Sequence, residues 1–192
     1  MDRDVRAGQQ LQVVAGLDAA LACGILHRDV KPSNCFVESD GTVKVGDFGL
    51  SIPVLAPDVT QPGEMVAFQG TPQFAAPEQL RGLRLDVRAD IYAVGATLYY
   101  LLTGHPPFED RDLMALLTRV ATEPPAPPSR PGTVIAAGLS ALVLRCLAKN
   151  PTDRPGSYAE LEASLRPFSS AVPVAASLGL RAVAGLIDWL LL

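Results

Sequence analysis

The chain has 192 residues, of which 48% are hydrophobic and 19% are charged, a composition that excludes a disordered chain. Its net charge of −4 and the lack of a basic run argue against nucleic-acid binding. Three cysteines without a C-x-x-C motif, and two histidines far apart, argue against a disulfide scaffold and a zinc site.

The first predicted element is a helix over residues 4–23, because apolar residues recur there at spacings of three and four. Gly24 stands where a glycine would end this helix. Short strand-like runs follow at 35–37 and 43–45, and the Asp40-Gly41 dipeptide between them is a strong turn signal. The sequence therefore predicts a helix followed by a β-hairpin.

Residues 53–69 contain prolines and a glycine without clean periodicity, which indicates a long loop. A helix with little polarity on any face follows over 91–102, as expected of a buried helix, and Gly104 ends it. An amphipathic helix over 113–120 precedes a proline-rich stretch at 124–131 that should be extended.

Two more helices are predicted. The apolar pattern over 139–147 indicates one of them. The other begins after Ser157, because Ser157 and Glu160 form the S-x-x-E pattern of a capping box, and it runs to Leu165. With five or six helices and one hairpin, the predicted fold class is mainly α.

Three motifs carry chemistry, and they occur in a fixed order. His27-Arg28-Asp29-Val30-Lys31-Pro32-Ser33-Asn34 follows the first helix, Asp47-Phe48-Gly49 follows the hairpin, and Ala76-Pro77-Glu78 follows the long loop. This order resembles the protein-kinase signature of H-R-D-x-K-x-x-N, D-F-G and A-P-E. Each motif alone is weak, but three in this order, with a helix, a hairpin and a loop in place, make a strong signal.

The chain resembles bacterial serine/threonine kinases in particular. Lys31 and Gly70-Thr71-Pro72 are typical of that class, and the N-P-T-D-R-P run at 150–155 resembles the family's late arginine motif. The resemblance covers about residues 4–167. It implies that residues 1–167 form the mainly α-helical large, C-terminal lobe of a protein kinase, with a small β-hairpin beside the active site.

The resemblance also implies roles for residues of the catalytic loop (residues 27–34) and its surroundings. Asp29 would accept the proton of the substrate hydroxyl, and Lys31 would place a positive charge on the transferring phosphoryl group of ATP. Asn34 and Asp47 would offer oxygen ligands to Mg²⁺. Thr71 would hold Asp29 and Lys31 in register and form the floor for the acceptor. Without its motif, Asp29 would be read as a solvated loop carboxylate.

Four residues are expected to give structural support. His27 would pack and hydrogen-bond behind the catalytic loop, and Asp90 would brace that loop from the start of the buried helix. Glu78 and Arg154 would form a buried ion pair, and the alternative is that they are unrelated surface charges.

Two residues are expected to take part in regulation. Arg28 would receive a phosphorylated activation segment, and the alternative is an ordinary surface charge. Thr60 lies between prolines of the long loop and is the preferred phosphorylation site. The rival hypothesis is a loop that is ordered without phosphorylation.

The sequence departs from the family upstream of His27. No glycine-rich loop precedes the catalytic loop, and Lys31, Lys44 and Lys149 leave the family's small-lobe lysine without a counterpart. We therefore expect a fragment whose missing partner is the N-terminal lobe, and we expect the isolated polypeptide to be inactive. A non-catalytic, kinase-like binding module is the alternative function.

The C-terminal residues have a different composition. Residues 168–178 are interpreted as a linker, and 179–192 as an apolar segment shorter than the roughly 20 residues of a membrane helix. With Arg181 before its apolar run and Asp188 within it, this segment resembles the start of the RDD family of bacterial membrane domains. The alternatives are a tail helix packed on the kinase lobe, or a lobe appended to a membrane sensor or transporter.

The resemblance as a whole implies a serine/threonine protein kinase that uses ATP and Mg²⁺. Its expected partners are proteins with a serine or threonine acceptor, and nucleic acid is not among them. The expected location is the cytoplasm, with a tether to the inner face of the bacterial plasma membrane if the RDD resemblance holds.

Overall fold

The computed structural model describes residues 3–53 and 70–169, which form a mainly helical fold with short antiparallel strands. The α-helices are α1 (Arg3–Ala22), α2 (Pro77–Leu80), α3 (Val87–Thr103), α4 (Leu113–Thr122), α5 (Ala137–Cys146) and α6 (Tyr158–Leu165). The 3₁₀ helices are η1 (Pro32–Asn34), η2 (Pro151–Asp153) and η3 (Arg166–Phe168). The strands are β1 (Ile25–Leu26), β2 (Cys35–Val37), β3 (Val43–Val45) and β4 (Ile52–Pro53). The predicted mainly α fold class is confirmed.

Helix α3 lies at the centre of the fold, and most of its side chains are buried. It begins at Val87 because the side chain of Asp86 accepts a hydrogen bond from the backbone N–H of Arg88 at 2.8 Å. The apolar pattern predicts a later start, so Asp90 lies in the first turn rather than at the beginning of the helix. Gly104 ends the helix in a left-handed conformation, with φ of 93°, as predicted.

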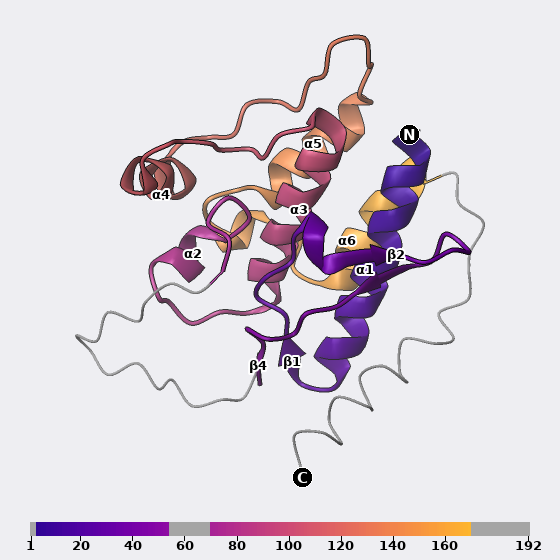
Figure 1. The fold of residues 1–192 in the computed structure, drawn as a ribbon, viewed down its shortest axis with the longest axis horizontal. Helices are drawn as coiled ribbons and strands as arrows, with labels where there is room; N and C mark the ends of the chain where they lie inside the picture. The colour runs from indigo at the N-terminus through magenta and orange to yellow at the C-terminus, as the bar shows by residue number, and fades with distance from the viewer. Residues whose placement is uncertain (1–2, 54–69, 170–192) are drawn as a thin grey trace.

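Helices α1, α5 and α6 pack around α3, whereas α2 and α4 contact each other (Figure 1). Helices α1 and α5 contact it directly, and α6 lies along α1. Helix α5 comes close because Gly95 has no side chain: a Cβ atom there would lie 2.5 Å from Cβ of Cys146. The continuous apolar core therefore joins helices from both ends of the described chain.

Strands β2 and β3 form the predicted hairpin, in which Cys35 pairs with Val45. Gly41 takes a left-handed φ of 84°, as its Asp-Gly turn requires. The backbone N–H of Val43 donates to Oε1 of Gln12 at 2.6 Å. The hairpin is thereby attached to α1, and it positions the residues that flank it in the sequence, Asn34 and Asp47.

The sequence does not predict a second antiparallel pair, which β1 and β4 form with Leu26 opposite Ile52. Each strand has two residues, which is too short for an alternating pattern to be visible. This pair brings the chain beyond the D-F-G motif back beside the start of the catalytic loop.

The predicted long loop over 53–69 begins one residue later, because Pro53 belongs to β4. The rest of that loop and the predicted apolar segment over 179–192 lie outside the described residues. The domain boundaries and the RDD resemblance therefore stay predictions. Within 3–53 and 70–169, no helix is both long enough and apolar enough to cross a membrane.

Candidate active site

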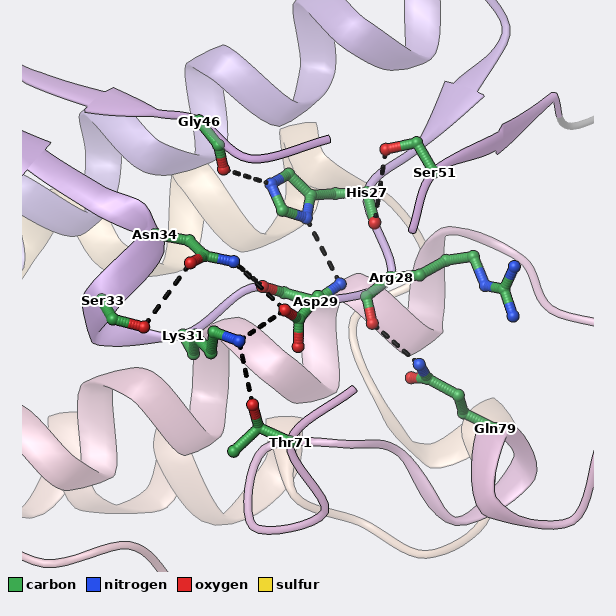
Figure 2. A network of polar contacts seen from close by, with 10 residues as sticks. All are labelled: His27, Arg28, Asp29, Lys31, Ser33, Asn34, Gly46, Ser51, Thr71 and Gln79. Carbon is green, nitrogen blue, oxygen red and sulfur yellow. Dashed lines mark hydrogen bonds and ion pairs between the residues drawn. The ribbon is translucent and has the colours of Figure 1, made fainter. Parts of the chain in front are cut away.

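The catalytic loop runs from β1 to β2 and holds Asp29 in the middle of a polar network (Figure 2). Nζ of Lys31 lies 2.6 Å from Oδ2 of Asp29 and 2.9 Å from Oγ1 of Thr71. The Asn34 amide donates to the backbone oxygen of Asp29 at 2.9 Å and to Oδ2 at 3.2 Å. Within the described residues Oδ1 of Asp29 has no hydrogen bond, so it is the oxygen free to accept a proton.

Asp90 holds the backbone at the start of this loop. Its carboxylate accepts hydrogen bonds from the backbone N–H of His27 at 2.9 Å and of Arg28 at 2.8 Å. Arg28 has a φ of 69°, in a region that residues with a side chain adopt rarely. The side-chain amide of Gln79 donates to the Arg28 carbonyl at 2.8 Å. Hydrogen bonds to its N–H and to its carbonyl therefore hold Arg28 in this left-handed conformation. Strained backbone of this kind is typical of functional sites.

His27 is fully buried and connects the catalytic loop to the D-F-G motif. Its Nδ1 accepts from the backbone N–H of Asp29 at 3.3 Å, and its Nε2 lies 3.1 Å from the carbonyl of Gly46 (Figure 2). These contacts fit the tautomer that carries its proton on Nε2. The imidazole ring also lies 4.5 Å from the Phe48 ring, between centroids. His27 thus packs and hydrogen-bonds behind the catalytic loop.

Asn34 and Asp47 lie at the same end of the hairpin. The backbone N–H of Gly46 donates to the Asn34 carbonyl at 3.0 Å, and Asp47 is the next residue. Asn34 is buried and uses its amide nitrogen to brace Asp29, whereas Asp47 is exposed and has a left-handed φ of 61°. No described residue hydrogen-bonds to the Asp47 carboxylate. One carboxylate and one amide oxygen fit Mg²⁺, which keeps waters and phosphate oxygens among its ligands.

Glu78 and Arg154 form a bidentate ion pair, with distances of 2.6 Å and 2.9 Å. Both side chains are buried, at 9% and 0% exposure. The guanidinium group also donates to the carbonyls of Ala148 and Arg88 and lies 4.9 Å from the Tyr92 ring. The pair ties the A-P-E motif in α2 to the segment before α6.

Of the two residues predicted for regulation, the structure describes only Arg28. Arg28 is half-buried, and its Nε is buried without a hydrogen-bond partner among the described residues. Thr60 lies outside the described residues. Their proposed pairing through a phosphate stays a prediction.

The motifs and periodicities of the sequence do not identify three residues near the site. Gln79 is separated from Arg28 by 51 residues, and Tyr158, whose hydroxyl donates to Asp90 at 2.9 Å, is separated from it by 68. No local periodicity signals contacts over such separations. Phe36 is 53% exposed on the hairpin, and a Cβ at Gly46 would lie 2.8 Å from its ring. An exposed aromatic residue in a short strand gives a weak signal, because single exposed apolar residues are common.

Comparisons of the sequence with known proteins show the family of this chain. A family model described as the protein kinase domain matches residues 3–165. The chain is 41% identical over 165 residues to serine/threonine-protein kinase pkn3 of Myxococcus xanthus, a match that covers 81% of this chain and 30% of the relative. It is 39% identical over 169 residues to serine/threonine-protein kinase PknB of Mycobacterium leprae, covering 86% of this chain and 27% of the relative. The chain thus spans less than a third of the length of either relative.

Proposed function

This chain belongs to the protein kinase family, and we propose that its described residues form the large catalytic lobe of a serine/threonine kinase. The predicted resemblance to bacterial serine/threonine kinases is confirmed. The reaction we propose transfers the γ-phosphoryl group of ATP to a serine or threonine hydroxyl of a protein substrate. The family match ends at residue 165, so the resemblance of 179–192 to an RDD domain stays a prediction.

The observation that carries this proposal is the network around Asp29. Lys31 and Asn34 of the catalytic loop hydrogen-bond to Oδ2 of Asp29, and Thr71, from a distant segment, holds Lys31 in turn. Oδ1 of Asp29 is left without a partner among the described residues. In this arrangement the acceptor hydroxyl donates its proton to Asp29 and is oriented for in-line attack. Thr71 holds Lys31 close to the same point, where its positive charge faces the transferring group.

Asn34 and Asp47 would hold Mg²⁺, which neutralises negative charge on the ATP phosphates when it is bound. Asp47 contributes the exposed carboxylate, and Asn34 contributes the oxygen of an amide whose nitrogen already bonds to Asp29. The exposed Phe36 ring on the same hairpin offers an apolar surface to the base of the nucleotide.

The test uses two polypeptides, the 192-residue chain alone and a fusion in which the small lobe of a relative precedes it. The chain alone should not transfer phosphate, because its residues contact the phosphates from one side and water stays over the γ-phosphate. The fusion should phosphorylate a generic acceptor protein. In the fusion, Asp29→Asn should lower kcat by roughly 10²–10⁴, which is the usual contribution of a general base, and leave ATP affinity unchanged.

The matched control is Asp40→Asn at the tip of the hairpin. Asp40 is exposed, and its Oδ1 accepts a hydrogen bond from the backbone N–H of Thr42, which an asparagine oxygen also accepts. This variant should keep wild-type kcat. An Asp29→Asn fusion with more than about a third of wild-type kcat would contradict the role of Asp29. A folded fusion that binds ATP but transfers no phosphate would favour a binding module instead.

A further inference from the structure

Asp90 is a buried carboxylate that depends on neutral donors. It is 1% exposed, and no ion pair involving it occurs among the described residues. Its Oδ1 accepts from the backbone N–H of Arg28, and its Oδ2 accepts from the backbone N–H of His27 and from the hydroxyl of Tyr158. Its place in the first turn of α3 also stabilises a negative charge, through the helix dipole. Each of the three donors is therefore important, because a buried charge is costly when its hydrogen bonds are incomplete.

The hydroxyl of Tyr158 comes from a distant part of the chain. Tyr158 is the first residue of α6, it is 1% exposed, and its oxygen lies 2.9 Å from Oδ2 of Asp90. Burial raises the pKa of this phenol, and the neighbouring Asp90 carboxylate raises it further. The phenol therefore keeps its proton and is the donor in this bond.

We propose that Tyr158 is a positioning residue for phosphoryl transfer, which holds the Asp90 carboxylate in the orientation that fixes the backbone before Asp29. The inference rests on the proposed kinase function for its catalytic consequence, but not for its geometry. Without the hydroxyl, the Asp90 carboxylate keeps its two backbone donors and gains freedom to rotate. The carboxylate then holds the left-handed backbone of Arg28 less firmly. The orientation of Asp29, the next residue, becomes less well fixed as a consequence.

The chain provides a matched control in Tyr92. This residue is also a buried tyrosine, at 0% exposure, but its hydroxyl has no hydrogen-bond partner in the described part of the chain. Tyr92→Phe and Tyr158→Phe therefore delete the same atom from two buried rings. One deletion removes a bond to Asp90, and the other removes none.

The first measurement is amide hydrogen exchange of the 192-residue chain, followed by NMR. Tyr158→Phe should raise the exchange rates of the His27 and Arg28 amides by about tenfold relative to core amides of α3, on the scale of a lost hydrogen bond to a charged group. Tyr92→Phe should leave this ratio within about twofold, since no hydrogen bond is lost. A purely structural role for Tyr158 would raise all these rates together, and an unchanged ratio would overturn the proposal.

The second measurement is kinetic and uses the fusion with a small lobe. Tyr158→Phe should lower kcat by about threefold to tenfold with an unchanged KM, because the substrate-binding surfaces are intact. If exchange changes as expected but the wild-type fusion transfers no phosphate, the proposed function fails and the positioning of the loop stands. If exchange changes and kcat does not, the catalytic part of the inference is wrong.

A measurement on the wild-type chain covers the case in which Tyr158→Phe does not fold. A phenol proton donated to a buried carboxylate exchanges slowly and gives its own NMR signal. This signal should show a nuclear Overhauser contact to the His27 amide proton, because both protons point at Oδ2 of Asp90. Absence of the signal would overturn the proposal without any variant.

Discussion

Asp47 and Asn34 share one end of the hairpin but differ in charge and exposure. Asp47 is exposed and carries a full charge, whereas the buried Asn34 is neutral and also braces Asp29. The motif predicts that both residues face the nucleotide. It gives no indication that the Asn34 nitrogen is already engaged, because that contact depends on the 3₁₀ turn of η1.

We therefore expect substitutions of the two residues to have different effects in the small-lobe fusion. Asp47→Ala should weaken Mg²⁺-dependent ATP binding by about tenfold or more, since changes even to outer-shell groups typically cost 10–100-fold in metal affinity. Asn34→Ala should weaken binding less, but it should also lower kcat, because it removes a brace from Asp29. Titration calorimetry with and without Mg²⁺ measures the first effect, and Asp40→Ala on the same hairpin is the control. Wild-type affinity that is independent of Mg²⁺ would contradict both assignments.

At the scale of elements, the sequence predicts best where a pattern is long. The periodicity over 4–23 and the apolar run over 91–102 lead to α1 and α3 with small errors at the ends. The β1–β4 pair is missed because two residues carry no pattern. The capping box is only partly as expected: Ser157 accepts from the Glu160 N–H, but the Glu160 side chain accepts from Gly156 rather than from Ser157.

The connection between α2 and η2 leads to a prediction about stability. Arg154→Met would leave the Glu78 carboxylate buried and unpaired, which should cost about 3–5 kcal/mol and lower the melting temperature by roughly 6–20 °C. The control is Arg145→Met, which breaks a pair with Glu160 of the same 2.6 Å length between exposed side chains. That change should cost less than about 1 kcal/mol. Thermal unfolding of the two variants compares them, and equal losses would mean that burial of the pair has no special importance.

At the scale of the whole molecule, the candidate active site is built from segments far apart in the sequence. Asp90 in α3 accepts hydrogen bonds from the catalytic loop and from Tyr158 of α6, and Arg154 pairs with Glu78. Motif order can predict which family such a chain belongs to, since it reflects the shared fold. Through the family resemblance it also leads to the Asp90 and Glu78–Arg154 contacts, but not to the bond between Tyr158 and Asp90, which depends on how α3 and α6 pack.

Lys149 makes another contact that the sequence does not predict, because it connects the segment before η2 to the end of α4. Its Nζ donates to the carbonyl of Val120 at 2.6 Å and lies 4.0 Å from the centroid of the Phe108 ring. Burial, with a smaller contribution from the positive charge of Arg154, lowers the pKa of Lys149 to about 8. In the unfolded chain the amine has its ordinary pKa of about 10.5.

The stability of the protein should therefore depend on pH in a defined direction. Between about pH 8 and 10.5 the unfolded chain binds a proton that the folded chain has released, so raising the pH across this window favours the folded state. Unfolding in denaturant at pH 7 and pH 10 should show that wild type gains stability relative to Lys149→Met, while other titrating groups cancel in the difference. Wild type should show no such gain relative to Lys44→Met, which removes an exposed lysine of β3. A wild-type advantage that shrinks at pH 10 would mean that the Val120 carbonyl and the Phe108 ring hold the charged ammonium more strongly than burial opposes it.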